Sequence, residues 1–293
     1  MSSTVEAQAF TLPATDGYAL AATRYPATGH KRGHLVVAPA TAVPQRFYRR
    51  FAEHAASRGL EVWTLDYRGI GGSKPATLRG FEMDYLDWAE KDLAALVAQV
   101  PKDAPLYWVG HSFGGHALGL MPEPERVQAA CFFGVGAGWH GWMPRLERLR
   151  VWMMWHVLGP LMTRWKGYLP WSLLGMGEDL PLGVYRDWRH WCHFPRYFFD
   201  DPARPEMAQR FAQVRTPILA YNALDDLWAL PRSREAFMAG YSQAPWRGQD
   251  LDPHLSHGHI GHMGYFRPQA QSLWDDCLNH LIGAPDGHGS AAL

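Results

Sequence analysis

A sharp turn around Ser112 constrains the fold of this chain more than any other sequence feature. An apolar run at 106–109 leads into Gly-His-Ser-Phe-Gly at 110–114, and small residues dominate the segment up to 119. Glycines on both sides of Ser112 permit a strained strand-to-helix turn that lifts the serine hydroxyl out of a sheet. The helix that follows directs its positive end toward that hydroxyl. G-x-S-x-G in this context is typical of a nucleophile elbow.

An acid and a histidine follow the serine in a recognisable order. Asp225 and Asp226 come after an apolar segment at 217–221, and the pair Gly261-His262 lies near the end of the chain. The order Ser, Asp, His is that of the α/β-hydrolases, and it differs from the two common serine-protease orders.

On these residues the chain resembles the α/β-hydrolases, and specifically bacterial members of that superfamily whose substrate is unassigned. The matching segments cover nearly the whole chain: 110–114, the Asp-Tyr-Arg-Gly-Ile-Gly-Gly-Ser segment at 66–73, Asp225-Asp226 and Gly261-His262. One departure is that the His-Gly pair usual in the oxyanion loop is here Pro39-Ala40. The resemblance implies an α/β fold, with a mainly parallel sheet flanked by helices and an inserted helical cap.

A serine hydroxyl needs a base, because it is a poor nucleophile at neutral pH. Four histidines compete for this role, namely His254, His257, His259 and His262. We predict His262, because a Gly-His pair close to the final helix is where the family pattern places the base, and His259 is the second choice.

The acid and the oxyanion donors follow from the same resemblance. Asp226 falls where the family's aspartate ordinarily lies, whereas Asp225 would serve if the loop were one residue shorter, so both stay open. One of the pair is expected to form a turn with its own backbone. The backbone N–H groups of Phe113 and Thr41 are the predicted oxyanion donors.

Two other motifs invite functional interpretations. The glycine-rich segment 66–73 matches neither nucleotide-binding pattern, so we assign Asp66 and Arg68 to structure. The histidines of 254–262 could instead bind zinc, but no paired carboxylate lies among them, and Gly258 and Gly261 favour a loop. We predict no cofactor and no metal, with zinc as the rival hypothesis.

Composition narrows the partners and the compartment. Lys plus Arg and Asp plus Glu both number 28 in 293 residues, so no global field attracts nucleic acid or an anionic membrane. The three cysteines are far apart, which favours a reducing compartment. The N-terminus lacks a signal-peptide pattern, and no apolar run is long enough to span a bilayer. We therefore expect a cytoplasmic protein without stable membrane insertion.

The chain alternates predicted strands and helices, which indicates a mainly parallel sheet with an antiparallel start. A hairpin over 8–25 turns at Asp16-Gly17. Further strands are predicted at 35–38, 61–65, 106–109, 127–135 and 217–221, and one more fits before His262. Helices are predicted over 45–57, 82–100 and 268–282.

An aromatic-rich insertion divides the hydrolase core. We assign 1–137 and 206–283 to the core, 138–205 to a helical cap and 284–293 to a disordered tail. Eight of the fourteen tryptophans lie in the cap: Trp139, Trp142, Trp152, Trp155, Trp165, Trp171, Trp188 and Trp191. They could form the core of the cap, line an apolar pocket, or, over 150–165, form an interfacial helix that opens onto lipid.

The sequence thus predicts a serine hydrolase that cleaves a carboxylic ester or similar acyl compound through an acyl-enzyme on Ser112. Its substrate is expected to be a small acyl compound, apolar or aromatic. A thioesterase, an amidase and an acyltransferase are alternatives, because they share the tetrahedral intermediate. A non-catalytic protein that binds a ligand or partner is another. The oligomeric state is left open.

Overall fold

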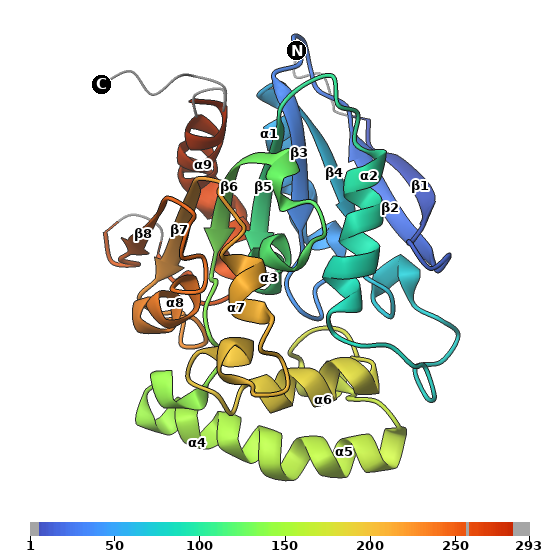
Figure 1. Ribbon diagram of the computed structural model, residues 1–293, viewed down its shortest axis with the longest axis vertical. Helices are drawn as coiled ribbons and strands as arrows, with labels where there is room; N and C mark the ends of the chain where they lie inside the picture. The colour runs from blue at the N-terminus through green and yellow to red at the C-terminus, as the bar shows by residue number, and fades with distance from the viewer. Residues whose placement is uncertain (1–5, 256–257, 284–293) are drawn as a thin grey trace.

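One sheet organises the protein. In the computed structural model, which describes residues 6–255 and 258–283, eight strands lie in the order β1-β2-β4-β3-β5-β6-β7-β8 (Figure 1). The strands are β1 (Gln8–Pro13), β2 (Ala19–Tyr25), β3 (Gly33–Ala38), β4 (Leu60–Leu65), β5 (Leu106–His111), β6 (Val127–Phe133), β7 (Ile218–Ala223) and β8 (Trp246–Leu251). Strand β2 pairs antiparallel with β1 and with β4, and the remaining pairs are parallel. The predicted fold class is confirmed.

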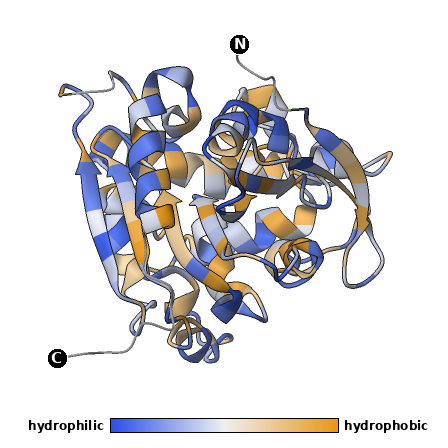
Figure 2. Cartoon of the chain, turned by 90° about the horizontal axis from the view of Figure 1, so that it is seen from above, coloured by the Kyte–Doolittle hydropathy of each residue, from blue (hydrophilic) through white to orange (hydrophobic). Residues whose placement is uncertain are grey.

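Helices cover both faces of the sheet. Helices α1 (Arg49–Ser57) and α9 (Gln271–Gly283) pack on one face, and α2 (Ala94–Gln99), α3 (Phe113–Leu120) and α8 (Pro231–Met238) pack on the other. Strand β3 shows why both faces must be covered. Leu35 and Val37 pack in the core on the α1 and α9 face, whereas Val36 and Ala38 pack in the core on the α2, α3 and α8 face. All four are buried. Figure 2 shows apolar residues, in orange, along strands that lie between helices.

Several element ends differ from the predicted ones. The helix predicted over 82–100 begins only at Trp88, with a π-helical turn (Trp88–Leu93) that continues into α2. Residues before it are held outside the helix, because the Asp84 N–H bonds the Asp87 carboxylate at 3.1 Å and the Tyr85 N–H bonds Asp187 at 2.9 Å. These side-chain acceptors compete with helical hydrogen bonds.

Two further boundaries also shift for local reasons. Strand β6 ends at Phe133 rather than 135, because Gly134 takes a φ of 62° that breaks the extended conformation. The closing helix starts at Gln271, after a 3-10 turn at Pro268–Ala270. The helix predicted over 45–57 likewise begins with a 3-10 turn, Gln45–Tyr48, before α1.

The chain between β6 and β7 forms a helical layer at one end of the molecule. Helices α4 (Arg145–Met153) and α5 (Gly159–Lys166) are joined by a π-helical turn (Met154–Leu158), and α6 (Leu182–Trp191) lies between them and the sheet (Figure 1). The short α7 (Met207–Phe211) leads back to β7. The predicted cap, 138–205, contains α4 to α6, and its bounds stay a prediction. The predicted disordered tail lies outside the described residues.

The tryptophans of this layer differ in exposure. Trp155, Trp171 and Trp191 are buried, as expected for an internal core. In contrast, Trp152 and Trp165 are 42% and 64% exposed. Other large apolar residues on α4, α5 and the turn between them are also exposed, namely Leu146, Leu149, Met153, Leu158 and Leu161. Internal packing therefore accounts for only part of the aromatic content.

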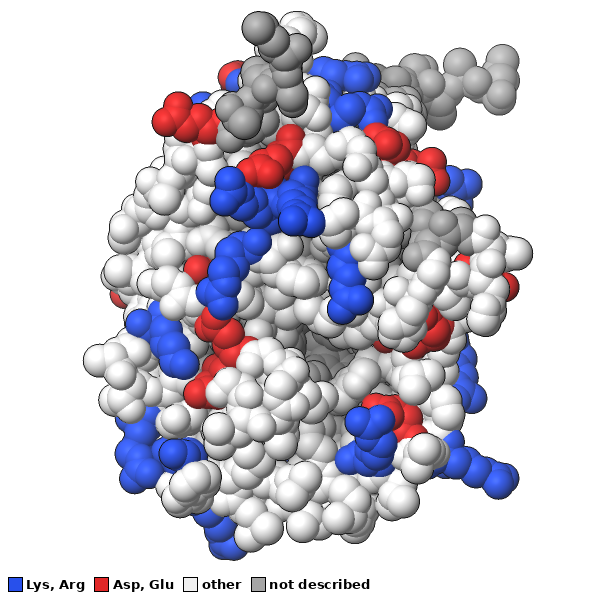
Figure 3. All heavy atoms as spheres, turned by 180° about the vertical axis from the view of Figure 1, so that it is seen from behind, with Lys and Arg blue, Asp and Glu red and all other residues white. Residues whose placement is uncertain are grey.

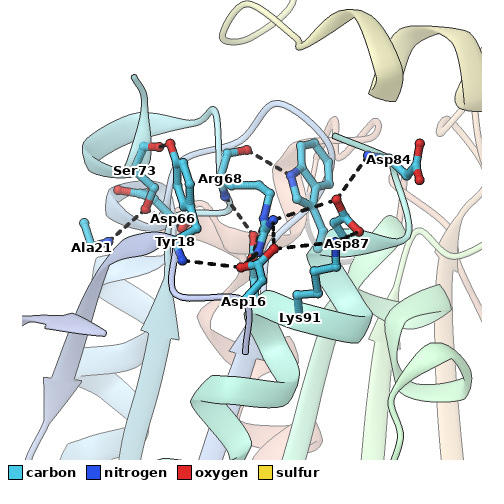
Figure 4. Close-up of polar contacts among 11 residues, drawn as sticks. Asp16, Tyr18, Ala21, Asp66, Arg68, Ser73, Asp84, Asp87 and Lys91 are labelled. Atoms are coloured by element: carbon cyan, nitrogen blue, oxygen red, sulfur yellow. Dashed lines mark hydrogen bonds and ion pairs between the residues drawn. The ribbon is translucent and has the colours of Figure 1, made fainter. Parts of the chain in front are cut away.

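An ion network centred on the buried Arg68 and Asp92 joins the hairpin turn to the loop after β4. The Arg68 side chain bonds Asp16 at 2.7 Å and Asp92 at 2.8 Å, and its carbonyl oxygen accepts the Trp88 indole N–H (Figure 4). The Ser73 hydroxyl donates to the Asp66 carbonyl oxygen in the same loop. These contacts agree with the structural assignment of Asp66 and Arg68.

The surface carries mixed charge. Lys and Arg side chains are interspersed with Asp and Glu over the face in Figure 3, and the totals of the two kinds are equal. Within the described residues, none of the helices has the length and apolarity needed to cross a membrane. The thiols of Cys131, Cys192 and Cys277 are buried and free.

Candidate active site

Ser112 occupies a strained turn between β5 and α3. Its φ and ψ are 52° and −110°, and its N–H bonds the Phe133 carbonyl oxygen at 2.8 Å. A Cβ at Gly114 would lie 2.1 Å from the Ala38 carbonyl oxygen, and one at Gly110 would lie 2.4 Å from the Gly114 backbone. Only glycine fits at either position: Gly110 because of the turn itself, and Gly114 because α3 begins close against β3.

Backbone strain concentrates around one cavity. Among the described residues, three other than glycine have a positive φ, namely Ala42, Ser112 and Tyr197. All three line a cavity of about 670 Å³. Strained residues persist where the surrounding structure holds them, and they cluster at functional sites. A cavity of this volume suits a small ligand.

The cavity lies at the carboxyl ends of the parallel strands, where ligands bind in open α/β sheets. Its walls come from the loops after β3, β5, β6 and β7 and from the helical layer between β6 and β7. Aromatic rings supply much of the lining: Phe47, Tyr85, Phe113, Trp171, Trp188, Tyr197 and Trp228. Glu178 and Arg46 also line it and form an ion pair at 2.9 Å.

His262 lines the same cavity and contacts a buried carboxylate. Its Nδ1 lies 3.0 and 2.9 Å from the two carboxylate oxygens of Asp226, which is fully buried. The Tyr265 hydroxyl donates to the same carboxylate at 2.9 Å. Burial alone would lower the pKa of His262, but the charge and hydrogen bond of Asp226 outweigh it and raise that pKa above its ordinary value.

Asp225 has different partners. Its carboxylate accepts the backbone N–H groups of Ile260 and Gly261 at 2.9 and 3.0 Å, and it pairs with His259 at 2.7 Å. The two neighbouring aspartates therefore divide their contacts, with Asp226 against the imidazole of His262 and Asp225 against the backbone of the loop that carries it. His254 is exposed, and His257 lies outside the described residues.

Gly134 lies between the strand end that contacts Ser112 and the imidazole of His262. It follows Phe133, whose carbonyl oxygen binds the Ser112 N–H. A Cβ at Gly134 would lie 3.3 Å from His262 Cε1 and 3.1 Å from the Asp226 carboxylate. The end of β6 therefore contacts the elbow through Phe133 and lies beside the imidazole at Gly134.

Two residues that the sequence argument did not single out hold these loops together. The Nε2 of His111 donates to the His262 carbonyl oxygen at 2.8 Å, and the Tyr48 hydroxyl contacts His111 Nδ1 at 2.8 Å. Tyr48 also accepts the Ala40 N–H at 2.8 Å. Burial lowers the pKa of His111 to about 3, so the imidazole is neutral. In the sequence, the position of His111 next to Ser112 is the feature that could have pointed to its role.

The two predicted oxyanion donors come from two different segments of the chain. Phe113 is the first residue of α3, so its N–H has no acceptor within the helix. Thr41 lies in the loop after β3, and its hydroxyl bonds that of Tyr85. Both residues line the cavity. Pro39 and Ala40 stand where the family usually has a His-Gly pair. In this loop the Ala40 N–H donates to the Tyr48 hydroxyl, and the Pro39 carbonyl oxygen accepts from the Tyr67 hydroxyl.

The rival zinc hypothesis gains no support from the geometry. Over residues 6–255 and 258–283, no group of three or more His, Cys, Asp or Glu side chains is arranged to hold a metal ion. His259 and His262 instead contact different aspartates.

Sequence comparison assigns the family. The profile of the serine aminopeptidase S33 family matches residues 29–178, just over half of the chain. The chain belongs to this family of α/β-hydrolases. The matched segment includes Ser112 but neither Asp226 nor His262. No curated protein sequence matches the chain significantly.

Solved structures extend the similarity to the whole fold. A soluble variant of monoglyceride lipase from Saccharomyces cerevisiae, in complex with a substrate analogue, is 16% identical over 96% of each chain, with a TM-score of 0.69. A thermostable carboxyl esterase from Bacillus coagulans is 14% identical over 96% of this chain and 99% of its own, with a TM-score of 0.65. Est816, an N-acyl homoserine lactone degrading enzyme, is 19% identical over 92% and 99%, with a TM-score of 0.59. At these identities the likeness concerns the fold.

Proposed function

We propose that the protein is a serine hydrolase that cleaves a carboxylic ester or a similar acyl compound through an acyl-enzyme on Ser112. In this proposal His262 is the general base, Asp226 orients it, and the N–H groups of Phe113 and Thr41 stabilise the oxyanion. The observation that carries the proposal is that the strained Ser112 and the carboxylate-bound His262 line one cavity.

The proposed reaction has two halves. Ser112 Oγ attacks the acyl carbon while His262 Nε2 accepts its proton, and the N–H donors stabilise the negative charge on the carbonyl oxygen. The intermediate collapses, the leaving group departs with the proton from His262, and the acyl group remains on Ser112. Water then attacks with its proton passing to His262, and the acid is released with Ser112 restored. Asp226 holds the imidazole tautomer throughout and stabilises the imidazolium.

The lining supports an acyl group that is largely apolar or aromatic. Trp171, Trp188 and Trp228 line the same cavity as Ser112 with flat apolar surfaces. The Lys, Arg, Asp and Glu side chains in the cavity wall are the Arg46–Glu178 pair and Arg267. The monoglyceride lipase and carboxyl esterase with this fold act on esters, which agrees with the proposal.

Other acyl chemistry fits the same residues. A thioester, an amide or transfer to an alcohol would pass through the same tetrahedral intermediate, so the leaving group and the acceptor distinguish these activities. A non-catalytic binding protein would use the cavity without covalent chemistry. Turnover with matched ester, thioester and amide substrates of one acyl group would separate the enzymes.

Labelling with a fluorophosphonate tests the proposal directly. The intact protein should gain the mass of one adduct, and peptide mapping should locate it on Ser112. Ser112→Ala should give no adduct. A folded protein that gains no adduct with a small fluorophosphonate would contradict the proposal and favour the binding protein.

A further inference from the structure

Tyr85 contacts both segments that carry the proposed oxyanion donors. Its hydroxyl bonds the hydroxyl of Thr41, in the loop after β3. Its ring stacks on that of Phe113, the first residue of α3, with the ring centroids 4.5 Å apart and the planes at 22°. Tyr85 is only 1% exposed, and it lines the same cavity as Ser112. One buried side chain therefore links the loop after β3 to the nucleophile elbow.

The loop that carries Thr41 contains a strained residue. Ala42 has a φ of 63°, a conformation that is costly for a residue with a side chain and persists only where the surrounding structure fixes it. The Ala42 carbonyl oxygen accepts the Glu178 N–H at 2.9 Å, and a Cβ at Gly177 would lie 2.9 Å from that oxygen. The loop is thus held at Ala42 by the segment after α5 and at Thr41 by the hydroxyl of Tyr85.

Helix α6 fixes Tyr85 in turn. The Tyr85 N–H bonds the Asp187 carboxylate at 2.9 Å, and the ring of Trp191 stacks on that of Tyr85 with centroids 6.0 Å apart. A Cβ at Gly183 would lie 1.7 Å from the Met83 carbonyl oxygen, so the helix packs directly against this segment. Gly183, Asp187 and Trp191 follow at intervals of four residues and lie on one face of α6. This face therefore holds both the backbone and the ring of Tyr85.

The phenol of Tyr85 is neutral in the pH range where a histidine base works. Burial raises the pKa of Tyr85 above its ordinary value, against the lowering effect of the Thr41 and Tyr197 hydroxyls. The hydroxyl therefore keeps its proton, and its bond to Thr41 does not change with pH in that range.

We propose that Tyr85 is a positioning residue, which fixes the Thr41 loop relative to the elbow so that both N–H donors meet the oxyanion. This role rests on the proposed function. Oxyanion donors must lie within hydrogen-bond distance of the place that the oxygen takes in the transition state, so a small shift of the Thr41 loop reduces turnover more than it reduces binding of the ester. Because α6 holds Tyr85, the helical layer and the oxyanion donors are structurally coupled.

Tyr85→Phe tests the role, because it keeps the ring and removes the hydroxyl. With para-nitrophenyl hexanoate, kcat should fall about 10- to 100-fold while KM changes less than about twofold. The pH at which kcat/KM rises should not move, because the base is untouched. Tyr18→Phe should keep the activity, because that hydroxyl bonds the Ser73 carbonyl oxygen away from the cavity.

A second variant tests the hydroxyl pair itself. Thr41→Val removes the other hydroxyl but keeps the backbone N–H, so it should lower kcat by about the same factor as Tyr85→Phe. The double variant should be no slower than either single variant, because both changes remove the same bond.

A pentyl trifluoromethyl ketone gives a readout that a merely structural role would not change. Ser112 Oγ adds to its carbonyl carbon, the serine proton passes to His262, and the carbonyl oxygen becomes an oxyanion. Tyr85→Phe should therefore weaken inhibition by this ketone about as much as it lowers kcat/KM. Calorimetric affinity of Ser112→Ala for the ester should be the same with and without Tyr85→Phe.

The outcomes separate this role from the proposed function. Wild-type kcat in a folded Tyr85→Phe variant, or losses that multiply in the double variant, would overturn the role and leave the serine hydrolase standing. A loss of ester affinity that accounts for the whole loss of kcat/KM would also overturn it, because Tyr85 would then contact the substrate. If the wild-type protein hydrolyses no ester and forms no fluorophosphonate adduct, the hydrolase itself is wrong.

Discussion

The Nε2 of His111 donates a hydrogen bond to the backbone carbonyl oxygen of His262 at 2.8 Å. His111, the residue before Ser112 in the elbow pentad, therefore holds the loop that carries the proposed base His262. Through Tyr48, the same imidazole is linked to the Ala40 N–H in the proposed oxyanion loop. A short chain of hydrogen bonds thus connects the three loops on which the proposed chemistry depends.

Replacement of His111 by Leu should lower kcat more than it raises KM. The change removes the donor to the His262 carbonyl oxygen and the acceptor of the Tyr48 hydroxyl proton, at about 1–3 kcal/mol each, although the Tyr48 hydroxyl keeps the Ala40 N–H as a donor. A loosened His262 loop should reduce kcat roughly 10- to 100-fold, because misplaced catalytic groups are costly. Steady-state kinetics and denaturant unfolding would measure both effects. Unchanged kcat in a destabilised variant would mean that His111 serves stability alone.

Asp226→Asn should mainly reduce activity, whereas Asp225→Asn should mainly reduce stability. Loss of the Asp226 charge should lower kcat about 10⁴-fold, as expected when the carboxylate that orients a catalytic histidine is replaced. Asp225→Asn weakens contacts to Ile260, Gly261 and His259, so it should mainly reduce stability, by about 1–3 kcal/mol. The reverse pattern of kcat values would assign the acid to Asp225.

The activity should depend on pH through His262. Its pKa is raised in the folded protein, so the neutral base is lost as pH falls through a value above about 6.5, and kcat/KM should rise with pH across that value. The linked stability has the opposite sign. It is fully present below about pH 6.5 and is lost as pH rises through the folded pKa. A kcat/KM profile that is flat from about pH 5 to 8 would contradict the role of His262.

The face formed by α4 and α5 should adsorb reversibly to anionic lipid. Residues 145–166 include five basic residues and one acidic residue in a chain of zero net charge, beside the exposed Trp152, Leu161 and Trp165. The protein should float with phosphatidylglycerol vesicles but not with phosphatidylcholine vesicles.

A double variant, Leu161→Glu with Trp165→Glu, should abolish this adsorption. Leu255→Glu is the matched control, because Leu255 is 82% exposed on a different loop, and it should adsorb normally. A protein that instead forms dimers, which the double variant dissociates, would show that a second copy covers the face.

Arg68→Met should destabilise the protein by about 3–5 kcal/mol near neutral pH, because it leaves the carboxylate of Asp92 buried and unpaired. Burial already raises the pKa of Asp92 to about 6, against the lowering effect of Arg68. A raised carboxyl pKa contributes stability below about pH 4 that is lost as pH rises through the folded value, and removal of Arg68 raises that value further. Urea unfolding should therefore show a smaller loss at about pH 5 than at about pH 8. Equal losses would show that Asp92 does not titrate in this range.

The sequence by itself determined the fold class and the position of Ser112. The G-x-S-x-G turn is partly local, because a side chain at Gly110 would collide with the backbone of Gly114 in the same pentad. The alternation of apolar strands with helices follows from covering both faces of a parallel sheet. The same patterns could not predict that the helix starts at Trp88. Its start is delayed because the carboxylates of Asp87 and Asp187 accept hydrogen bonds from the backbone N–H groups of Asp84 and Tyr85.

Only the tertiary structure decided which carboxylate lies against His262. Asp225 and Asp226 differ by one position in a loop, and their partners lie more than thirty residues further along the chain. It also decided that Trp155 is buried while Trp165 is exposed, and that Tyr197 takes a positive φ. Local sequence patterns reflect the propensity for helix or strand and the spacing of apolar residues. Contacts between distant segments depend instead on how each loop closes, and no short pattern encodes that geometry.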